Sequence, residues 1–198
     1  MAASGIILAG GRSSRMGRDK TLIMYKNETL IARTVNELRG VTDDIVIASN
    51  DTAKYNLAGV REVPDACPGM GPLGGMFAAL TAARYEEAIV VAGDMPFFTG
   101  RLAAWLLARK DGYDAVVPRI GGKWEPLAAV YSRACLGPIG DCLKTGIRKV
   151  HMFYPAVRVL AVNEDELSAA GFPAEAFHNL NAPEDLAALG EENCPADR

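Results

Sequence analysis

The chain has 198 residues, of which 49% are hydrophobic and 23% charged, and this size supports one compact domain rather than two. Its formal net charge of -3 lacks the basic excess that neutralises a nucleic-acid backbone, so we expect no nucleic-acid partner. No apolar run approaches the ~20 residues needed to span a bilayer, so we expect no membrane association.

The sequence also indicates the cellular location, the domain bounds and the state of the cysteines. The first apolar run, Gly5–Leu8, is too short for a signal peptide, and we expect a cytoplasmic protein. We expect one domain over residues 1–189 and a flexible polar tail over 190–198. The cysteines show no CxxC pair or regular zinc-ligand spacing, which favours free thiols. They are Cys67, Cys135, Cys142 and Cys194.

Short apolar runs alternate with helical patterns along the chain. The predicted strands are Gly5–Leu8, Ile45–Ala48, Val60–Val63, Ala88–Ala92, Ala115–Val117, Leu127–Tyr131 and Arg158–Val162. The predicted helices are Thr29–Leu38, Leu73–Arg84, Leu102–Arg109, Arg133–Leu143 and Pro183–Leu189. This alternation predicts an α/β fold: a single Rossmann-like domain whose mostly parallel central sheet carries helices on both faces.

The segment after the first predicted strand is rich in glycine and basic residues. In open parallel sheets ligands bind beyond the carboxyl ends of the strands. Gly10 and Gly11 let backbone N–H groups approach phosphate oxygens, and four cations over residues 12–20 would offset the charge of a nucleoside triphosphate. The spacing matches neither GxGxxG nor GxxxxGK[ST]. The alternative is a glycine-rich surface turn with solvated basic side chains.

Two later segments also follow predicted strands. Asp65 precedes a turn in which Gly71 and Pro72 begin a helix, whose N-terminus would favour anions; an ordinary strand-to-helix turn is the alternative. Asp94 follows the strand Ala88–Ala92 and supplies one carboxylate. Mg2+ commonly bridges one protein carboxylate to substrate phosphates. On local sequence alone, a helix cap or an Asx turn before Pro96 is an equal alternative for Asp94.

Residues 8–20 read LAGGRSSRMGRDK, which resembles the LAGG-x-S-x-RMG-x-DK signature of molybdenum cofactor guanylyltransferases, within the nucleotide-diphospho-sugar transferase superfamily. The resemblance runs from about residue 5 to residue 189 and is strongest in the first half. It implies that Arg15, Lys20 and Asp94 are catalytic and that Asp94 binds the metal. The nucleotide-binding residues that it implies are Leu8, Ala9, Gly10, Gly11, Lys20, Asn50, Asp65, Gly71 and Asp94.

The second half of the chain carries the acceptor-side candidates. The resemblance extends to Trp124, Arg148, Asn179 and Asn181 as acceptor-binding residues. The Trp124 ring is a candidate to stack on a planar pterin, with ordinary packing as the alternative. Alanine replaces the family's usual threonine at position 182, which leaves Asn181 as the expected local cap.

The resemblance implies transfer of GMP from GTP to the terminal phosphate of molybdopterin, with release of pyrophosphate. The implied cofactor is Mg2+, with Mn2+ as a substitute, and transient contacts with cofactor-biosynthesis proteins or molybdoenzymes are expected. The residues alone leave open a CTP-dependent molybdenum cofactor cytidylyltransferase and a sugar-phosphate or polyol-phosphate nucleotidyltransferase. A nonenzymatic module that binds a nucleotide or molybdopterin is the alternative from another class.

Overall fold

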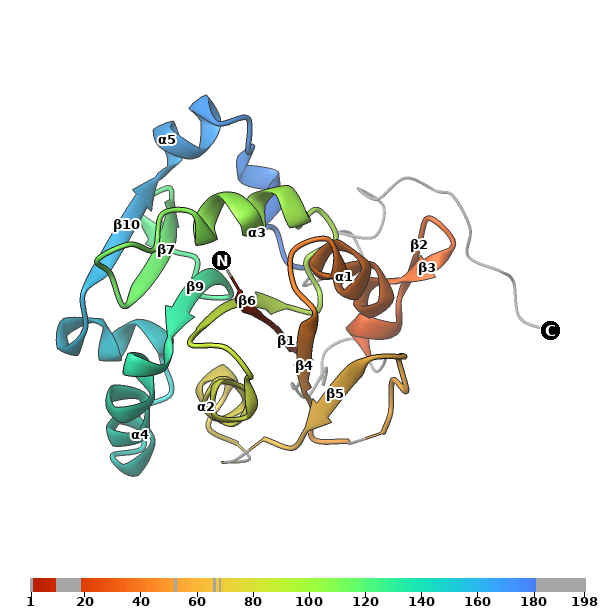
Figure 1. The fold of residues 1–198 in the computed structure, drawn as a ribbon, viewed down its shortest axis with the longest axis horizontal. Coiled ribbons are helices and arrows are strands. Elements are labelled where there is room, and N and C mark those ends of the chain that lie inside the picture. The colour runs from red at the N-terminus through yellow and green to blue at the C-terminus, as the bar shows by residue number, and fades with distance from the viewer. Residues whose placement is uncertain (1, 10–18, 52, 66, 68, 181–198) are drawn as a thin grey trace.

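The computed structural model describes residues 2–9, 19–51, 53–65, 67 and 69–180. Within them, eight strands form one sheet of order β10-β7-β9-β6-β1-β4-β5, with β8 paired to β7, and β2 and β3 form a separate hairpin (Figure 1). The strands are β1 Ser4–Leu8, β2 Met24–Tyr25, β3 Glu28–Thr29, β4 Asp44–Ala48, β5 Val60–Val63, β6 Glu87–Ala92, β7 Ala115–Ile120, β8 Lys123–Trp124, β9 Ala128–Ser132 and β10 Val159–Asn163.

The central strands are buried on both faces. All residues of β1, β4 and β9 are buried, because successive side chains of a strand point to opposite faces and both faces are covered. The main sheet is parallel at four of its seven strand junctions. The exceptions are β9, which runs antiparallel to both β6 and β7, and the short β8, which runs antiparallel to β7.

Five α-helices and four short 310 turns connect the strands. The helices are α1 Leu30–Arg39, α2 Pro72–Ala82, α3 Gly100–Leu107, α4 Leu136–Lys144 and α5 Glu164–Ala169. The turns are η1 Lys20–Leu22, η2 Arg133–Cys135, η3 Val150–Ala156 and η4 Ala174–Phe177. Threonine hydroxyls cap two helices: Thr29 accepts from the Ala32 N–H at the start of α1, and Thr99 accepts from the Leu102 N–H at the start of α3.

Helices cover both faces of the sheet, with α1, α3 and α5 on one side and α2 and α4 on the other (Figure 1). Each face has its own apolar core. The first includes Ile7, Ile47, Ile89, Ile31, Val35, Leu102 and Leu167. The second includes Ile6, Val46, Val90, Met76, Leu80 and Ile139. The two-sided burial explains why these strands read as continuous apolar runs.

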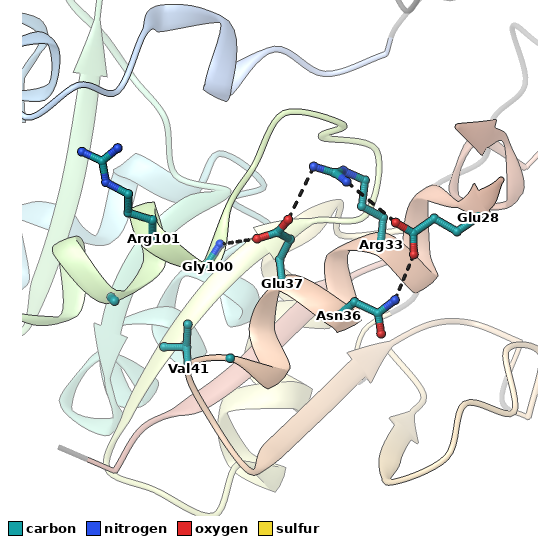
Figure 2. A pocket seen from close by; sticks show the side chains of 9 residues that line it. Glu28, Arg33, Asn36, Glu37, Val41, Gly100 and Arg101 are labelled. Atoms are coloured by element: carbon teal, nitrogen blue, oxygen red, sulfur yellow. Dashed lines mark hydrogen bonds and ion pairs between the residues drawn. The ribbon is translucent and has the colours of Figure 1, made fainter. Parts of the chain in front are cut away.

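Helices α1 and α3 meet closely at one point (Figure 2). The Gly100 N–H donates to Glu37 Oε2 at 2.8 Å, and a β-carbon at Gly100 would lie 2.4 Å from the Glu37 carbonyl oxygen. A glycine at the start of α3 therefore allows α3 to approach the backbone of α1.

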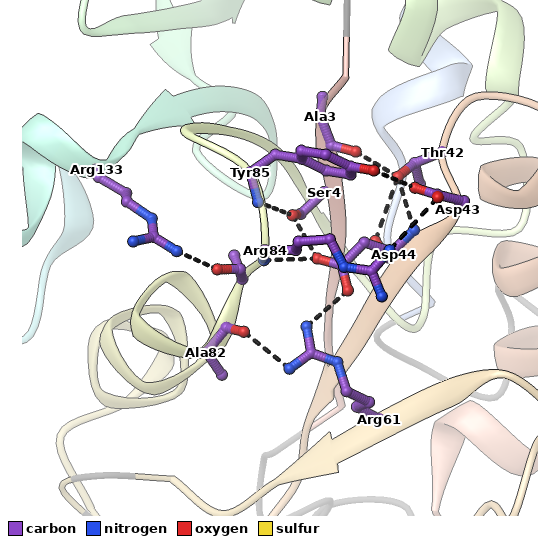
Figure 3. A network of polar contacts seen from close by, with 11 residues as sticks. Ala3, Ser4, Thr42, Asp43, Asp44, Arg61, Ala82, Arg84, Tyr85 and Arg133 are labelled. Atoms are coloured by element: carbon purple, nitrogen blue, oxygen red, sulfur yellow. Dashed lines mark hydrogen bonds and ion pairs between the residues drawn. The ribbon is translucent and has the colours of Figure 1, made fainter.

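A polar network closes the amino-terminal edge of the sheet (Figure 3). The Asp44 side chain is 1% exposed and accepts hydrogen bonds from Ser4 Oγ at 2.6 Å, the Arg84 N–H at 2.8 Å and Arg61 Nη2 at 2.6 Å. Burial alone would raise the pKa of Asp44, but these three bonds lower it below its usual value. The network joins strands β1, β4 and β5 to the end of α2.

The predicted fold class is confirmed: a single α/β domain with a mostly parallel sheet and helices on both faces. The hairpin β2–β3, strand β8 and helix α5 were not predicted, because they are short and carry little periodicity. The predicted helix Pro183–Leu189, the domain end at residue 189 and the tail over 190–198 lie outside the described residues. In the part of the chain that the structure describes, Cys67, Cys135 and Cys142 are free thiols and no helix is long and apolar enough to cross a membrane.

Candidate active site

The segments that follow β1, β4 and β6 begin side by side at one edge of the sheet. Leu8 pairs in register with Ala48 and Ala92, the last residues of β4 and β6. The Ala9 N–H donates to the Ala48 carbonyl at 2.9 Å, and the Gly93 N–H donates to the Leu8 carbonyl at 3.0 Å. These three segments therefore leave the sheet within hydrogen-bonding distance of one another, at the edge where open α/β sheets bind ligands.

Lys20 and Asp94, two of the predicted catalytic residues, lie together at this edge. Lys20 Nζ is 3.8 Å from Asp94 Oδ2, and the two side chains are 18% and 23% exposed. Lys20 begins the turn η1, which packs against the residue before Asp94: a β-carbon at Gly93 would lie 3.0 Å from the Thr21 methyl carbon. The glycine at position 93 thus lets η1 bring a cation to the predicted metal ligand.

The surroundings of Asp94 suit a metal ion that is shared with a substrate. Burial raises the pKa of the Asp94 carboxyl group above its usual value, and the Lys20 ammonium group opposes part of that rise. Among the described residues, no three His, Cys, Asp or Glu side chains gather into a metal-binding group. Mg2+ commonly retains waters and binds through one or two carboxylates plus phosphates. A single partly exposed carboxylate fits that mode of binding.

The side chains of Asp19, Lys54 and Tyr55 hold the turn that carries Lys20, and none of them was predicted. Asp19 accepts hydrogen bonds from the Thr21 N–H at 2.9 Å and the Thr21 hydroxyl at 2.7 Å, and it forms an ion pair with Lys54. Thr21 Oγ1 also lies 2.9 Å from the Tyr55 hydroxyl. Burial alone would raise the pKa of Asp19, but hydrogen bonds from Lys54 and Thr21 lower it. Ionised Asp19 therefore anchors η1.

Asp65 and Gly71 lie where β5 leads into α2. Asp65 Oδ1 accepts a hydrogen bond from the Cys67 N–H at 2.8 Å, and a β-carbon at Gly74 would lie only 2.2 Å from that oxygen. Gly71 precedes α2 with a φ of 68°, which favours glycine. A β-carbon at Gly75 would lie 3.3 Å from the side chain of the last β4 residue. The start of α2, where a helix favours anions, is therefore at the same sheet edge.

The predicted acceptor side reaches this edge from the second half of the chain. Because β9 is antiparallel to β6, it begins where β6 ends, and the Ala92 N–H donates to the Leu127 carbonyl at 2.9 Å. The Trp124 ring contacts Tyr154 edge-on at 5.1 Å between centroids, and the Arg119 guanidinium carbon lies 4.9 Å from the Trp124 centroid. Trp124 thus has a packing role, and its stacking on a pterin stays a prediction.

Arg148 and Asn179 lie beside the predicted nucleotide residues. Arg148 is exposed, and its carbonyl oxygen lies 3.8 Å from the position of a β-carbon on Gly71. Asn179 precedes Leu180, whose N–H donates to the Asp94 carbonyl at 3.0 Å. The fold therefore brings both segments next to the first-half residues, as an acceptor site would require.

Not every predicted residue is located by the structure. Gly10, Gly11, Arg15 and Asn181 lie outside the described residues, so their contacts stay predictions. Asn50 is exposed and stands two residues after the end of β4, at the same edge of the sheet.

Some of the residues that sequence reasoning missed had a signal in the sequence, and others had none. Asp19 stands next to Lys20 in the chain, and that adjacency was a usable signal. Lys54 is recognised only from the fold, because no spacing connects it to the other site residues, whereas Glu125 follows Trp124 directly in the chain. Burial raises the pKa of the Glu125 carboxyl group, and the charges of His178 and Lys123 oppose that rise.

A mostly parallel sheet whose strand ends gather a lysine, a carboxylate and a helix N-terminus is the arrangement of an α/β protein that binds phosphate groups. A family model described as the MobA-like NTP transferase domain matches residues 5–158. The match covers most of the chain, which therefore belongs to the family of MobA-like NTP transferase domains.

Relatives and a solved structure agree with this assignment. The chain is 42% identical over 186 residues to a Pelotomaculum thermopropionicum protein named "Probable molybdenum cofactor guanylyltransferase", covering 94% of this chain and 91% of the relative. It is 35% identical over 187 residues to the molybdenum cofactor guanylyltransferase of Desulfosudis oleivorans, covering 93% of each. The crystal structure of molybdopterin-guanine dinucleotide biosynthesis protein A from Archaeoglobus fulgidus matches with a TM-score of 0.81 and 25% identity, covering 94% of this chain and 96% of that one. The predicted resemblance is confirmed.

Proposed function

We propose that this protein transfers the GMP moiety of GTP to the terminal phosphate of molybdopterin, in a Mg2+-dependent reaction that releases pyrophosphate. The observation that carries the proposal is the pair of Lys20 and Asp94, 3.8 Å apart at the ligand-binding edge of the sheet. Membership in the family supports nucleotidyl transfer, and the names of the relatives support guanine as the base and molybdenum cofactor as the acceptor.

In the proposed reaction an oxygen of the acceptor phosphate forms a bond to the α-phosphorus of GTP. The bond from that phosphorus to the bridging oxygen breaks, and pyrophosphate leaves with the electron pair. An ionised phosphate monoester is already a nucleophile, so no serine, cysteine or histidine has to be activated. The protein contributes by placing the two phosphates in line and by neutralising charge.

Lys20 and Asp94 divide the charge neutralisation between them. The Lys20 ammonium group binds phosphate oxygens and stabilises the charge that develops on the leaving pyrophosphate. Asp94 would hold the divalent cation, for which we propose Mg2+, with Mn2+ as a substitute. Such a cation, when bound, polarises the phosphate oxygens. Asp19 and Lys54 keep η1, and with it Lys20, against the Asp94 segment.

The remaining predicted residues fall on the two sides of this pair. On the nucleotide side we place Asp65 and the start of α2, together with Leu8, Ala9, Gly10, Gly11, Arg15, Asn50 and Gly71. Arg15 assists Lys20 at the phosphates. On the acceptor side we place Trp124, Arg148, Asn179 and Asn181. The chain segments of Arg148 and Asn179 adjoin Gly71 and Asp94 respectively, which supports an acceptor site next to the nucleotide site.

The test is an assay of the purified protein with Mg2+, GTP and molybdopterin. We expect release of pyrophosphate and formation of a guanine dinucleotide. Replacing Asp94→Asn or Lys20→Met should lower kcat by about 10²- to 10³-fold, the range for removing one charge-stabilising group. Lys144→Met is the matched control, because Lys144 is exposed on α4 and pairs only locally with Asp141. Full activity in both site variants would contradict the mechanism.

The same assay separates the alternatives. Turnover with CTP in place of GTP would identify a cytidylyltransferase, and turnover with a sugar phosphate or polyol phosphate would identify a different acceptor. Binding of GTP without turnover, when a competent acceptor is present, would indicate a binding module. We also propose transient contacts with cofactor-biosynthesis proteins or molybdoenzymes, and a cytoplasmic location.

A further inference from the structure

A groove between α1 and the start of α3 contains a cluster of charged side chains behind the Asp94 segment. Its lining residues include Glu28, Arg33, Glu37, Gly100 and Arg101 (Figure 2). Arg33 lies at the centre of the polar contacts. Its guanidinium group is 3.7 Å from Glu28 and 3.5 Å from Glu37, and all three side chains are between 24% and 30% exposed.

Arg33 also reaches the loop that carries the predicted metal ligand. Arg33 Nε donates a hydrogen bond to the Pro96 carbonyl oxygen at 2.9 Å, two residues beyond Asp94. The Arg33 guanidinium carbon lies 5.7 Å from the centroid of the Tyr25 ring, and that ring contacts Phe97 edge-on at 6.4 Å. One side chain of α1 therefore holds the loop directly, and the hairpin contacts the next residue of the loop.

Glu37 holds the far end of the same loop. One turn along α1 from Arg33, Glu37 Oε1 pairs with the Arg33 guanidinium, and Glu37 Oε2 accepts from the Gly100 N–H at 2.8 Å. The loop from Pro96 to Gly100 is thus bonded to α1 at both ends. The guanidinium geometry explains why an arginine occupies position 33, because its planar array of N–H donors serves a carbonyl and two carboxylates simultaneously.

We propose that Arg33, oriented by Glu37, is a positioning residue that fixes the Asp94 carboxylate for binding of the divalent cation. This inference rests on the proposed function. The loop has an independent support at each side of Asp94: the Gly93 N–H donates to Leu8, and the Leu180 N–H donates to the Asp94 carbonyl. Among the described contacts, the bond from Arg33 Nε to the Pro96 carbonyl oxygen is the one hydrogen bond from α1 that restrains the backbone two residues after Asp94.

The expected signature is a large effect on the metal and a small effect on folding. Ion pairs as exposed as these contribute little to stability, whereas a misplaced metal ligand costs much of the catalytic rate. In Arg33→Met we expect the Mg2+ concentration for half-maximal pyrophosphate release to rise about tenfold and kcat to fall about tenfold. The affinity for GTP without Mg2+ and the thermal unfolding midpoint should stay near their wild-type values.

The experiment measures three quantities on each full-length variant: Mg2+-dependent pyrophosphate release, calorimetric GTP binding with and without Mg2+, and thermal unfolding by circular dichroism. Arg33→Lys keeps the positive charge beside Glu28 and Glu37 but loses the guanidinium fork, and we expect an intermediate Mg2+ requirement. Arg39→Met is the control, because Arg39 also lies on α1 and bonds a carbonyl, that of Ala58, away from the Asp94 loop. It should behave as wild type.

Two results would overturn the role of Arg33. One is a wild-type Mg2+ requirement and kcat in Arg33→Met; the other is an equal loss of GTP binding with and without Mg2+, which indicates a general structural defect. If Arg33→Met does not fold, Arg33→Lys decides the matter by the same readouts. Failure of the wild type to release pyrophosphate would instead contradict the proposed function, and GTP binding with and without Mg2+ would still report on Arg33.

Discussion

Replacing Gly74→Ala tests whether the close packing between α2 and Asp65 holds the nucleotide side of the site. The added β-carbon would lie 2.2 Å from Asp65 Oδ1 and 2.9 Å from the Cys67 carbonyl oxygen. Carbon contacts are optimal at about 3.5–4 Å, so the Asp65 side chain has to move by about 1 Å or more. That shift breaks the 2.8 Å hydrogen bond from the Cys67 N–H.

Two opposing effects decide the stability of this variant. Alanine is favoured over glycine inside a helix by about 1 kcal/mol. Overpacking costs about 1–3 kcal/mol, and loss of a hydrogen bond to a carboxylate costs about 1.5–3 kcal/mol. The unfavourable effects are larger, so we expect Gly74→Ala to lose about 1.5–5 kcal/mol of unfolding free energy. Displacement of Asp65 should also weaken GTP binding by about tenfold or more.

Gly137→Ala is the matched control for this prediction. Gly137 is an exposed residue in α4, and a β-carbon there would meet no atom within 4 Å apart from its chain neighbours and the backbone of its own helix. Alanine is favoured over glycine in a helix, but the following Pro138 disfavours the helical conformation for a residue with a β-carbon. We therefore expect Gly137→Ala to change the unfolding free energy by less than about 1 kcal/mol and to leave GTP binding unchanged. Urea unfolding and calorimetric GTP titration measure both quantities. A Gly74→Ala protein that matches Gly137→Ala in stability and the wild type in GTP affinity would refute the reasoning.

Two predictions concern buried polar groups. Asp44→Asn should lower the unfolding free energy by about 2–4 kcal/mol at pH 7. Because folding lowers the pKa of Asp44, its contribution is complete above the unfolded value of about 3.9 and disappears as pH falls through the folded value, so urea unfolding should show the difference from wild type shrinking in acid. Tyr131→Phe removes hydrogen bonds to Pro126 and Tyr154, each 2.9 Å, and should cost about 1–3 kcal/mol in the same assay, whereas an unchanged free energy would show that those bonds contribute nothing.

Much of the fold was predictable because its signals are local. Runs such as Ile45–Ala48 are apolar on every residue, and a strand buried on both faces requires that pattern. Gly71 and Pro72 mark the start of α2 by their backbone preferences. The short elements were missed for the converse reason: β2, β3 and β8 have two residues each, too few to show a period.

For the candidate site, the chain order alone identified the residue types and the strands that they follow. Glycines, a lysine and one carboxylate after buried strands indicate phosphate chemistry wherever those strands lie in the sheet. The sequence could not predict that Lys20 would stand 3.8 Å from Asp94, because their proximity depends on β1 and β6 being neighbours in register. Such pairing comes from packing of the whole sheet.

The direction of β9 and the contacts of α1 also could not be predicted from the sequence. An apolar run reads identically in both directions, so β9 could be identified as a strand while its antiparallel course, which brings Leu127 to the end of β6, could not. Arg33 resembles any surface arginine of an amphipathic helix until α1 packs beside the Asp94 loop. The sequence by itself determines the residue types and the local structure around them. The distances between remote side chains follow from the order of strands in the sheet and the packing of helices upon it.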